Sequence, residues 1–142
     1  MKLCLVDVNV LLALVARQHV HHDSARKWFG TLSAGEAGLC REVQLALIRL
    51  LNHRSVMGDD AISAGAAWRS IEELLEDERL ESVPEPPLLD SVLPTLLVQR
   101  MPAGKLVTDA YLAAFAIAAS RRLVTFDKGF RQFRRLELEL LH

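Results

Sequence analysis

The stretch Lys2-Leu3-Cys4-Leu5-Val6-Asp7-Val8-Asn9-Val10, close to the start of the chain, decides the fold that we expect. Its residues 3–6 form a short apolar run after a polar residue, which predicts a strand buried on both faces. In open α/β sheets, ligands bind beyond the carboxyl ends of the strands, so Asp7 is expected at the mouth of the sheet. Aspartate is also a favoured helix cap, and taken alone Asp7 is explained more simply as the cap of the helix that follows.

The composition is typical of a globular domain with its own core. The chain has 142 residues, of which 51% are hydrophobic and 25% charged. This length suits one domain, spanning residues 1–142. A formal net charge of −1 means that any binding site for a polyanion has to be a local patch. Without a membrane-spanning apolar run or a recognisable signal peptide, the chain is expected in the cytoplasm, with no membrane contact.

Short apolar segments alternate with amphipathic ones along the rest of the chain. After the first strand, strands are predicted at residues 35–40, 80–83, 123–126 and 136–141. Helices are predicted at residues 9–15, 25–32, 41–52, 61–75 and 88–99, with a last and very apolar helix opening at residue 106. This alternation favours an α/β fold: three α/β/α layers around a mostly parallel sheet of four to five strands. The two cysteines, Cys4 and Cys40, are expected as buried free thiols.

Polar residues and turn formers place the ends of these elements. Asp23 and Ser24 are expected to cap the second helix, and Asp59-Asp60 the long helix at residues 61–75. The segment 102–105 is predicted to be a turn or loop. Arg121-Arg122 is expected to end the last helix, because cations are favoured at a helix C-terminus.

Three histidines, His19, His21 and His22, lie in one polar segment and raise the question of a metal site. They lack the i, i+4 spacing that puts two ligands on one face of a helix. A solvated loop is therefore the favoured interpretation.

Three aspartates, far apart in the sequence, are expected to meet at one edge of the sheet. Asp7 and Asp127 each follow a predicted strand, and Asp109 opens the last predicted helix. Carboxylates brought close together repel one another, and a divalent cation relieves that repulsion. Mg²⁺ and Mn²⁺ prefer hard oxygen ligands. Such an ion activates water and neutralises a scissile phosphate, so the three acids predict phosphodiester hydrolysis.

Polar and basic residues near these acids fit the same chemistry. Thr108 and Thr125 each lie close to an acid in sequence, and Asn9 is placed to orient Asp7. A local phosphate-binding patch is predicted from Arg41, Arg49 and Lys128, with Arg54, Lys105, Arg131, Arg134 and Arg135 as further members. Taken singly, each basic residue is explained more simply as ordinary surface charge.

Three blocks of sequence carry a resemblance to a known family. They are Leu5-Val6-Asp7-Val8-Asn9-Val10-Leu11, residues 106–114 and residues 123–133. With these blocks the chain resembles a PIN domain, and more narrowly a VapC-type toxin of a bacterial type II toxin–antitoxin (VapBC) system. Residues 40–52 resemble the third helix of one branch of these toxins. The resemblance covers nearly the whole chain.

The resemblance implies a PIN-like fold and a Mg²⁺- or Mn²⁺-dependent endoribonuclease. The usual targets of such toxins are structured RNAs, tRNA or rRNA. It also implies a cognate VapB-type antitoxin that blocks the site and a toxin that forms a homodimer. We expect the amphipathic helix of the antitoxin to enter an exposed apolar groove.

The acidic quartet of the family maps onto Asp7, Asp109 and Asp127. The resemblance makes Asp7 and Asp109 ligands of a first ion and gives Asp127 a second ion or an ion-bound water. Most members carry a glutamate early in the third helix, where this chain has Gln44 or Ala46. Glu42 lies one helical turn before Ala46, and we take it as the fourth acid, a further ligand or a general base.

Two other functions stay open from the sequence. One is a catalytically degenerate PIN domain that binds RNA or a protein partner, which the uncertain fourth acid suggests. The other is a phosphotransfer domain with Asp7 as covalent nucleophile. The RNA target, the cleavage site, the number of metal ions and the identity of the antitoxin are open as well.

Overall fold

A five-stranded parallel sheet forms the centre of the molecule in the computed structural model, which describes residues 2–98 and 103–142. The strands are β1 (Cys4–Val6), β2 (Ala37–Leu39), β3 (Leu80–Ser82), β4 (Arg122–Thr125) and β5 (Leu138–Leu140). They lie in the order β3-β2-β1-β4-β5, and every neighbouring pair is parallel. The predicted fold class is confirmed, and all five predicted strands are present.

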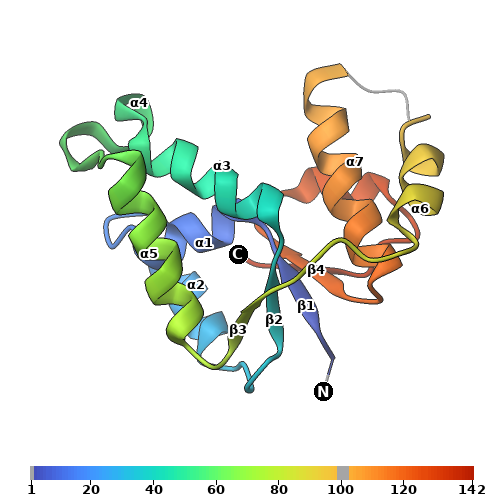
Figure 1. Ribbon diagram of the computed structural model, residues 1–142, viewed down its shortest axis with the longest axis horizontal. Coiled ribbons are helices and arrows are strands. Elements are labelled where there is room, and N and C mark those ends of the chain that lie inside the picture. Colours follow the sequence, from blue (N-terminus) through green and yellow to red (C-terminus); the bar gives the residue numbers. More distant parts are fainter. Residues whose placement is uncertain (1, 99–102) are drawn as a thin grey trace.

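Helices cover both faces of this sheet (Figure 1). One face carries α1 (Val8–Val15), α2 (His22–Phe29), α3 (Arg41–Asn52), α4 (Arg54–Met57) and α5 (Ala64–Glu76), and the other carries α6 (Leu89–Leu96) and α7 (Ala103–Ala118). The short 3₁₀ segments are η1 (Gly58–Asp60) and η2 (Lys128–Gln132). The chain builds outward from β1 to β3 and then returns through α6 and α7 to β4. The direction of winding therefore reverses between β1 and β4, which is where α/β sheets bind ligands.

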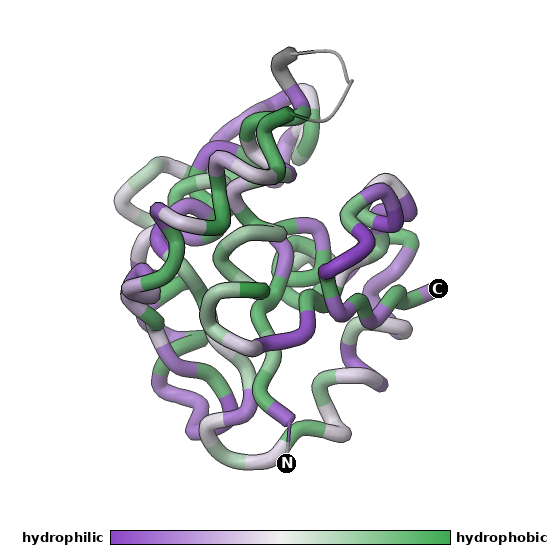
Figure 2. Tube along the Cα trace, turned by 90° about the vertical axis from the view of Figure 1, so that its right-hand side faces the viewer, coloured by the Kyte–Doolittle hydropathy of each residue, from purple (hydrophilic) through white to green (hydrophobic). Residues whose placement is uncertain are grey.

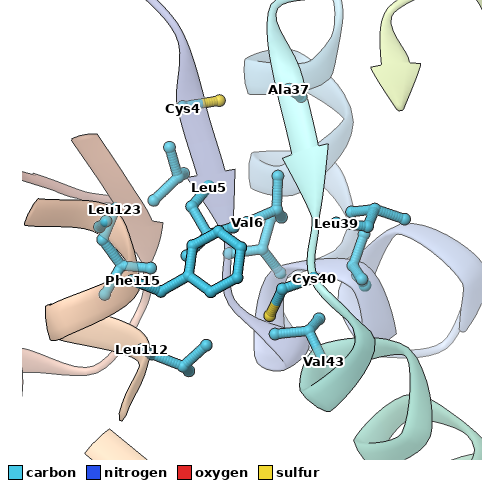
Figure 3. Packing of buried hydrophobic residues seen from close by; sticks show 14 of the residues in the cluster. Cys4, Leu5, Val6, Ala37, Leu39, Cys40, Val43, Leu112, Phe115 and Leu123 are labelled. Carbon is cyan, nitrogen blue, oxygen red and sulfur yellow. The ribbon is translucent and has the colours of Figure 1, made fainter. Parts of the chain in front are cut away.

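The central strands are buried on both faces, as their apolar sequences predict. Leu5, Val6 and Leu123 have no exposed surface, and Phe115 of α7 is 1% exposed. Figure 3 shows Phe115 packed over β1 beside Leu5, Leu112 and Leu123. Burying one such side chain contributes about 1.5–3 kcal/mol. In Figure 2, the segment that leads inward from the N-terminus is hydrophobic, whereas many outer turns are hydrophilic.

Both cysteines are buried free thiols, as expected. Burial raises the pKa of Cys4 and of Cys40 to about 11. Such thiols stay protonated and act as small apolar side chains. In the described part of the chain, no helix is both long and apolar enough to cross a membrane.

Two predicted helix caps are wrong. The helix predicted from residue 25 begins earlier, at His22, so Asp23 lies inside its first turn instead of capping it. The long helix begins at Ala64, where the hydroxyl of Ser63 accepts the N–H of Ala66 at 3.1 Å. Asp59-Asp60 belongs to η1 instead, because Gly58, with φ of +58°, ends α4 and turns the chain into a 3₁₀ segment.

The segments around α7 also differ from the prediction. The helix predicted at residues 88–99 is the shorter α6, and Gln99 lies outside the described residues. The segment predicted as a turn at residues 102–105 opens α7 from Ala103 onward, and Pro102 lies outside the described residues.

Arg121 and Arg122 do not end the last helix. The helix stops at Ala118, and Ser120, with φ of 55°, turns the chain toward β4. Arg122 opens β4, and Arg121 donates to the carbonyl of Cys4 and to Glu81 Oε1, each at 3.0 Å. Both arginines therefore form hydrogen bonds at the amino end of the sheet instead of stabilising a helix terminus.

Candidate active site

The carboxyl ends of β1 and β4 lie side by side and position two of the predicted acids. Val6 is paired with Val124, and the N–H of Asp7 donates to the Val124 carbonyl at 3.0 Å. Thr125 ends β4, and Asp127 follows at the start of η2. Both carboxylates therefore stand at the point where the winding of the sheet reverses.

A cavity of about 180 Å³ opens at this point. Its lining residues are Asp7, Val8, Asn9, Glu42, Val43, Ala46, Thr108, Asp109, Leu112 and Asp127. The structure thus brings together all four predicted acids, with Asn9 and Thr108 beside them, from opposite ends of the chain. Their individual roles stay a prediction.

Asp7 is fixed by two hydrogen bonds. Its Oδ1 accepts the N–H of Val8 at 2.7 Å, so it does cap α1, and its Oδ2 accepts the hydroxyl of Thr125 at 2.6 Å. Asn9 accepts the N–H of Phe126 at 3.3 Å and lies 3.4 Å from the Thr125 hydroxyl. Asn9 therefore orients Asp7 through Thr125. Burial raises the pKa of Asp7 above its usual value, although both hydrogen bonds oppose this.

Asp109 lies on α7 and is 7% exposed. Its Oδ2 is buried and has no hydrogen-bond partner. Burial, aided by the charges of Asp127 and Asp7, raises the pKa of Asp109 to about 6 against the opposing charge of Lys105. A buried carboxylate oxygen without a donor is costly unless a proton or a cation reaches it.

Asp127 differs from the other two aspartates because it has a cation. Lys105 Nζ lies 2.9 Å from Asp127 Oδ2, and the N–H of Gly129 donates to Asp127 Oδ1 at 2.8 Å. Partial burial alone would raise the pKa of Asp127, but these two hydrogen bonds hold it below its usual value.

The donor set fits a hard divalent ion, although it is not arranged as a finished site. Within residues 2–98 and 103–142, no three His, Cys, Asp or Glu side chains are grouped closely enough to hold a metal. The cavity nonetheless offers carboxylate oxygens, among them the unpaired Asp109 Oδ2. Oxygen ligands of this kind are what Mg²⁺ and Mn²⁺ prefer.

Comparison with known proteins gives the family. The family model described as "PIN domain" matches residues 4–136. The chain belongs to the PIN domain family. Ribonuclease VapC41 of Mycobacterium tuberculosis is 39% identical over 142 residues, which cover 96% of this chain and 97% of that protein. Ribonuclease VapC44 of the same organism is 33% identical over 128 residues, covering 88% and 86%.

Solved structures share the PIN fold at lower identity. VapBC2 from Rickettsia felis, bound to a promoter DNA fragment, gives a TM-score of 0.72 at 18% identity, covering 99% of this chain and 100% of that one. Mycobacterium tuberculosis VapC20, described as a sarcin-ricin loop cleaving toxin, gives 0.64 at 17% identity, covering 91% and 93%. The resemblance to a PIN domain of VapC type is confirmed.

The third helix of this PIN domain contributes Glu42 to the cavity. Glu42 also lines two adjoining cavities of about 680 and 240 Å³, so it stands where the three meet. Arg49 Nη2 lies 3.4 Å from Glu42 Oε1, which confirms that these two residues share one helix stripe. Ala46, one turn further on, lines the acidic cavity without adding a charge.

Gln44 does not occupy the place of the missing acid. It is 1% exposed, and its amide donates to the Leu39 carbonyl at 3.2 Å and to Ser82 Oγ at 3.1 Å. Its Oε1 accepts Arg41 Nη1 at 2.7 Å. Gln44 therefore joins β2, β3 and Arg41 and takes no part in the lining of the acidic cavity.

The predicted phosphate contacts have different surroundings. Arg41 lines the cavity of about 680 Å³ beside Glu42, with its guanidinium 5.5 Å from the centre of the Trp68 ring. Arg49 is paired with Glu42, and Lys128 is exposed on η2. Thr108 is exposed at the rim of the acidic cavity, whereas Thr125 is fully buried within hydrogen-bonding distance of Asp7.

Two features near the site were missed by the sequence reasoning. His21 stacks on Phe126 with ring centres 4.4 Å apart, and His22 Nδ1 lies 2.7 Å from the Ala13 carbonyl, so neither is free in a solvated loop. Lys105 was expected in a turn, as one member of the phosphate-binding patch. Its spacing of four residues before Asp109 was the available signal, because on a helix that spacing puts both on one face.

Proposed function

We propose that this PIN domain is a metal-dependent endoribonuclease, the toxin of a VapBC-type toxin–antitoxin pair. The observation that carries the proposal is the convergence of Asp7, Asp109 and Asp127 on one cavity, where Asp109 keeps a buried oxygen without a partner. The relatives VapC41 and VapC44 are ribonucleases by name, and VapC20 is described as cleaving the sarcin-ricin loop. The chain is accordingly a hydrolase of RNA phosphodiester bonds, and structured tRNA or rRNA is the proposed substrate, in the cytoplasm.

The proposed cofactor is Mg²⁺ or Mn²⁺. Asp7 and Asp109 would hold a first ion, and Asp127 a second ion or a bound water. The ion supplies an activated water and neutralises charge on the scissile phosphate. Glu42, which also lines the cavity, is the proposed further ligand or general base.

The chain itself prepares the geometry for this chemistry. Both oxygens of Asp7 are hydrogen-bonded, so its carboxylate holds one orientation. Thr125 and Asn9 are therefore positioning residues, because they act on Asp7 and not on the substrate. Thr108 at the rim offers a hydroxyl to a carboxylate or a water.

RNA needs cations beside the acids, because the cavity alone repels a polyanion. Arg41 is the best placed of the predicted contacts. Its guanidinium is held by the neutral partners Gln44 and Trp68, so its charge is uncompensated by them, and it faces the cavity that adjoins Glu42. Arg49 and Lys128 are proposed as weaker contacts.

A degenerate binding module is the second candidate, and two observations favour it. Ala46 stands in the cavity where most relatives were expected to have an acid, and Lys105 already neutralises part of the cavity. Retained RNA binding without Mn²⁺ binding, measured by calorimetry, would select this candidate. The phosphotransfer alternative is dropped, because the relatives are ribonucleases.

The proposed antitoxin site is a groove of about 500 Å³ between α1, α3, α4 and α5. Apolar side chains that include Leu12, Leu51, Val56 and Met57 line it, and Val56 is 46% exposed. Several structural neighbours are VapBC complexes, which supports a VapB-type helix as the occupant. A homodimer is proposed as well, and exposed Val98 and Val107 suit a self-association surface.

The experiment that tests the nuclease is RNA cleavage by the full chain with Mg²⁺ and with EDTA. We expect Asp7→Asn to lower the cleavage rate by at least about 1,000-fold at an unchanged thermal melt, because the ion loses a ligand. Asp59→Asn is the matched control, since Asp59 is fully exposed on η1 and outside the cavity. Equal cleavage by Asp7→Asn and wild type would end the assignment.

The toxin part of the proposal has its own test. Expression of the chain should arrest bacterial growth, and co-expression with the neighbouring reading frame should restore it. Growth arrest that no neighbouring frame relieves would remove the toxin–antitoxin claim and leave the nuclease claim standing.

A further inference from the structure

Each oxygen of Asp127 has one partner. Oδ1 accepts the backbone N–H of Gly129 at 2.8 Å, and Oδ2 lies 2.9 Å from Lys105 Nζ. The bond to Gly129 belongs to the turn that starts η2, so it persists as long as the turn does. A divalent ion bound at Asp127 Oδ2 would lie next to the Lys105 ammonium group, so the two cations would repel each other and compete for this oxygen.

The residues around Asp127 and Lys105 favour this ion pair. Lys105 lies one helical turn before Asp109 on α7, and its ammonium group contacts Asp127, which lines the acidic cavity. A Cβ at position 129 would lie 3.0 Å from Asp127 Oδ1, a tight contact, so a glycine there leaves room for the Asp127 carboxylate. The hydrogen bond to Asp127 and the charges of Asp127, Asp109 and Asp7 all raise the pKa of Lys105. Three carboxylates thus share one internal cation.

We propose that Lys105 is an internal counterion of the acidic cavity, which competes with the divalent ion for Asp127 Oδ2 and so sets the ion concentration at which the site fills. The inference rests on the proposed function, because it concerns the same metal site. It makes Lys105 a residue that determines metal affinity, and not one more member of a phosphate-binding patch.

The competition is weak enough to be reversible. The Lys105 side chain is 59% exposed, and an exposed lysine pair is a modest, salt-screened interaction. A bound divalent ion also repels the ammonium group, which can turn into solvent at little cost. Removing the lysine charge should therefore tighten ion binding about three- to tenfold without changing the fold.

The test is Mn²⁺ binding to the full chain, measured by isothermal titration calorimetry at pH 7.5 and fixed ionic strength. Lys105→Gln removes the charge and keeps most of the length, and we expect about three- to tenfold tighter binding. Lys105→Arg keeps the charge and should resemble wild type. Lys27→Gln is the matched control, because Lys27 is an exposed lysine on α2, outside the acidic cavity, for which no ion pair is found within the described residues.

The outcomes separate this inference from the proposed function. Tighter binding by Lys105→Gln alone, together with loss of that gain in the Asp127→Asn background, supports the inference. Wild-type Mn²⁺ binding that Lys105→Gln leaves unchanged or weakens overturns the inference and leaves the metal site standing. If neither wild type nor Lys105→Gln binds Mn²⁺ while both melt cooperatively, the proposed metal site fails and the inference fails with it.

Discussion

The two ends of the central sheet differ in whether their carboxylates are paired with cations. At the amino end, Arg122 donates to Glu36 Oε2 at 2.8 Å and to Glu139 Oε1 at 2.6 Å. The hydrogen bond from Arg122 is the main reason why the pKa of Glu36 lies below its usual value. At the carboxyl end, Asp109 keeps a buried oxygen without a partner, and burial raises its pKa to about 6.

This contrast separates charges that hold the fold from charges that are available for chemistry. The carboxylates of Glu36, Glu81 and Glu139 are each matched by the planar guanidinium of Arg121 or Arg122, a geometry that stabilises both partners. Among the described residues, the carboxyl end brings Asp7, Asp109 and Asp127 near one ammonium group, that of Lys105. Perturbed carboxylates grouped in a cavity are typical of functional sites, and the shortage of positive charge there points to an ion from solution.

The largest expected effect comes from exchanging one carboxylate at each end for its amide. Asp109→Asn should lower Mg²⁺-dependent RNA cleavage by at least about 1,000-fold, because it removes a proposed ligand. Glu36→Gln should cleave within about twofold of wild type once corrected for the folded fraction, since Glu36 lies at the other end of the sheet. A similar loss in both variants would break the distinction between the two ends.

The two ends should change places when stability is measured instead of activity. At the amino end, exchanging a carboxylate for its amide should destabilise the fold. Glu36 is 9% exposed, and Glu36→Gln replaces a charge-assisted bond with a weaker one beside the partly buried guanidinium of Arg122. We expect the free energy of unfolding to fall by about 1–3 kcal/mol, measured by urea denaturation at pH 7.5. A variant as stable as wild type would show that this ion pair contributes little to the fold.

At the carboxyl end, Asp109→Asn should stabilise the metal-free protein by a smaller amount. The folded-state pKa of Asp109, about 6, lies above the usual value of 3.8, so ionisation costs the folded state stability as the pH rises from about 4 through about 6. The amide carries no such cost, so with EDTA at pH 7.5 we expect a gain of about 1–2 kcal/mol. The gain should vanish at pH 4, and urea denaturation at both pH values measures it. No gain at pH 7.5 would mean that the Asp109 carboxylate is adequately solvated in the folded protein.

Much of the fold was predictable because it depends on local patterns. The apolar runs around Leu5 and Leu123 are short and bounded by polar residues, which locates β1 and β4 within a residue or two. The helix from Arg41 to Asn52 was predicted at its exact bounds. The predicted cap of the long helix was wrong because a backbone conformation decided where that helix begins. Gly58, with its positive φ, turns the chain into η1, which contains Asp59 and Asp60, and Ser63 caps α5 instead.

The gathering of the acids was predictable, but their partners were not. Asp7 and Asp127 follow strands that the fold class makes parallel, so their proximity follows from topology. The pairing of Asp127 with Lys105 depends on where α7 begins, and the predicted turn at residues 102–105 hid it. Likewise the hydrogen bonds of Gln44 to Leu39 and Ser82 depend on tertiary packing, and no sequence spacing shows them.

The most direct test of the central claim is the position of Mn²⁺, located by its anomalous scattering in crystals soaked at pH 7.5, above the pKa of about 6 that burial gives Asp109. We predict an ion in the cavity of about 180 Å³, bound by Asp7 and Asp109, with Lys105 turned away from Asp127. An empty cavity, or Mn²⁺ only at surface carboxylates such as Asp59, would contradict the account.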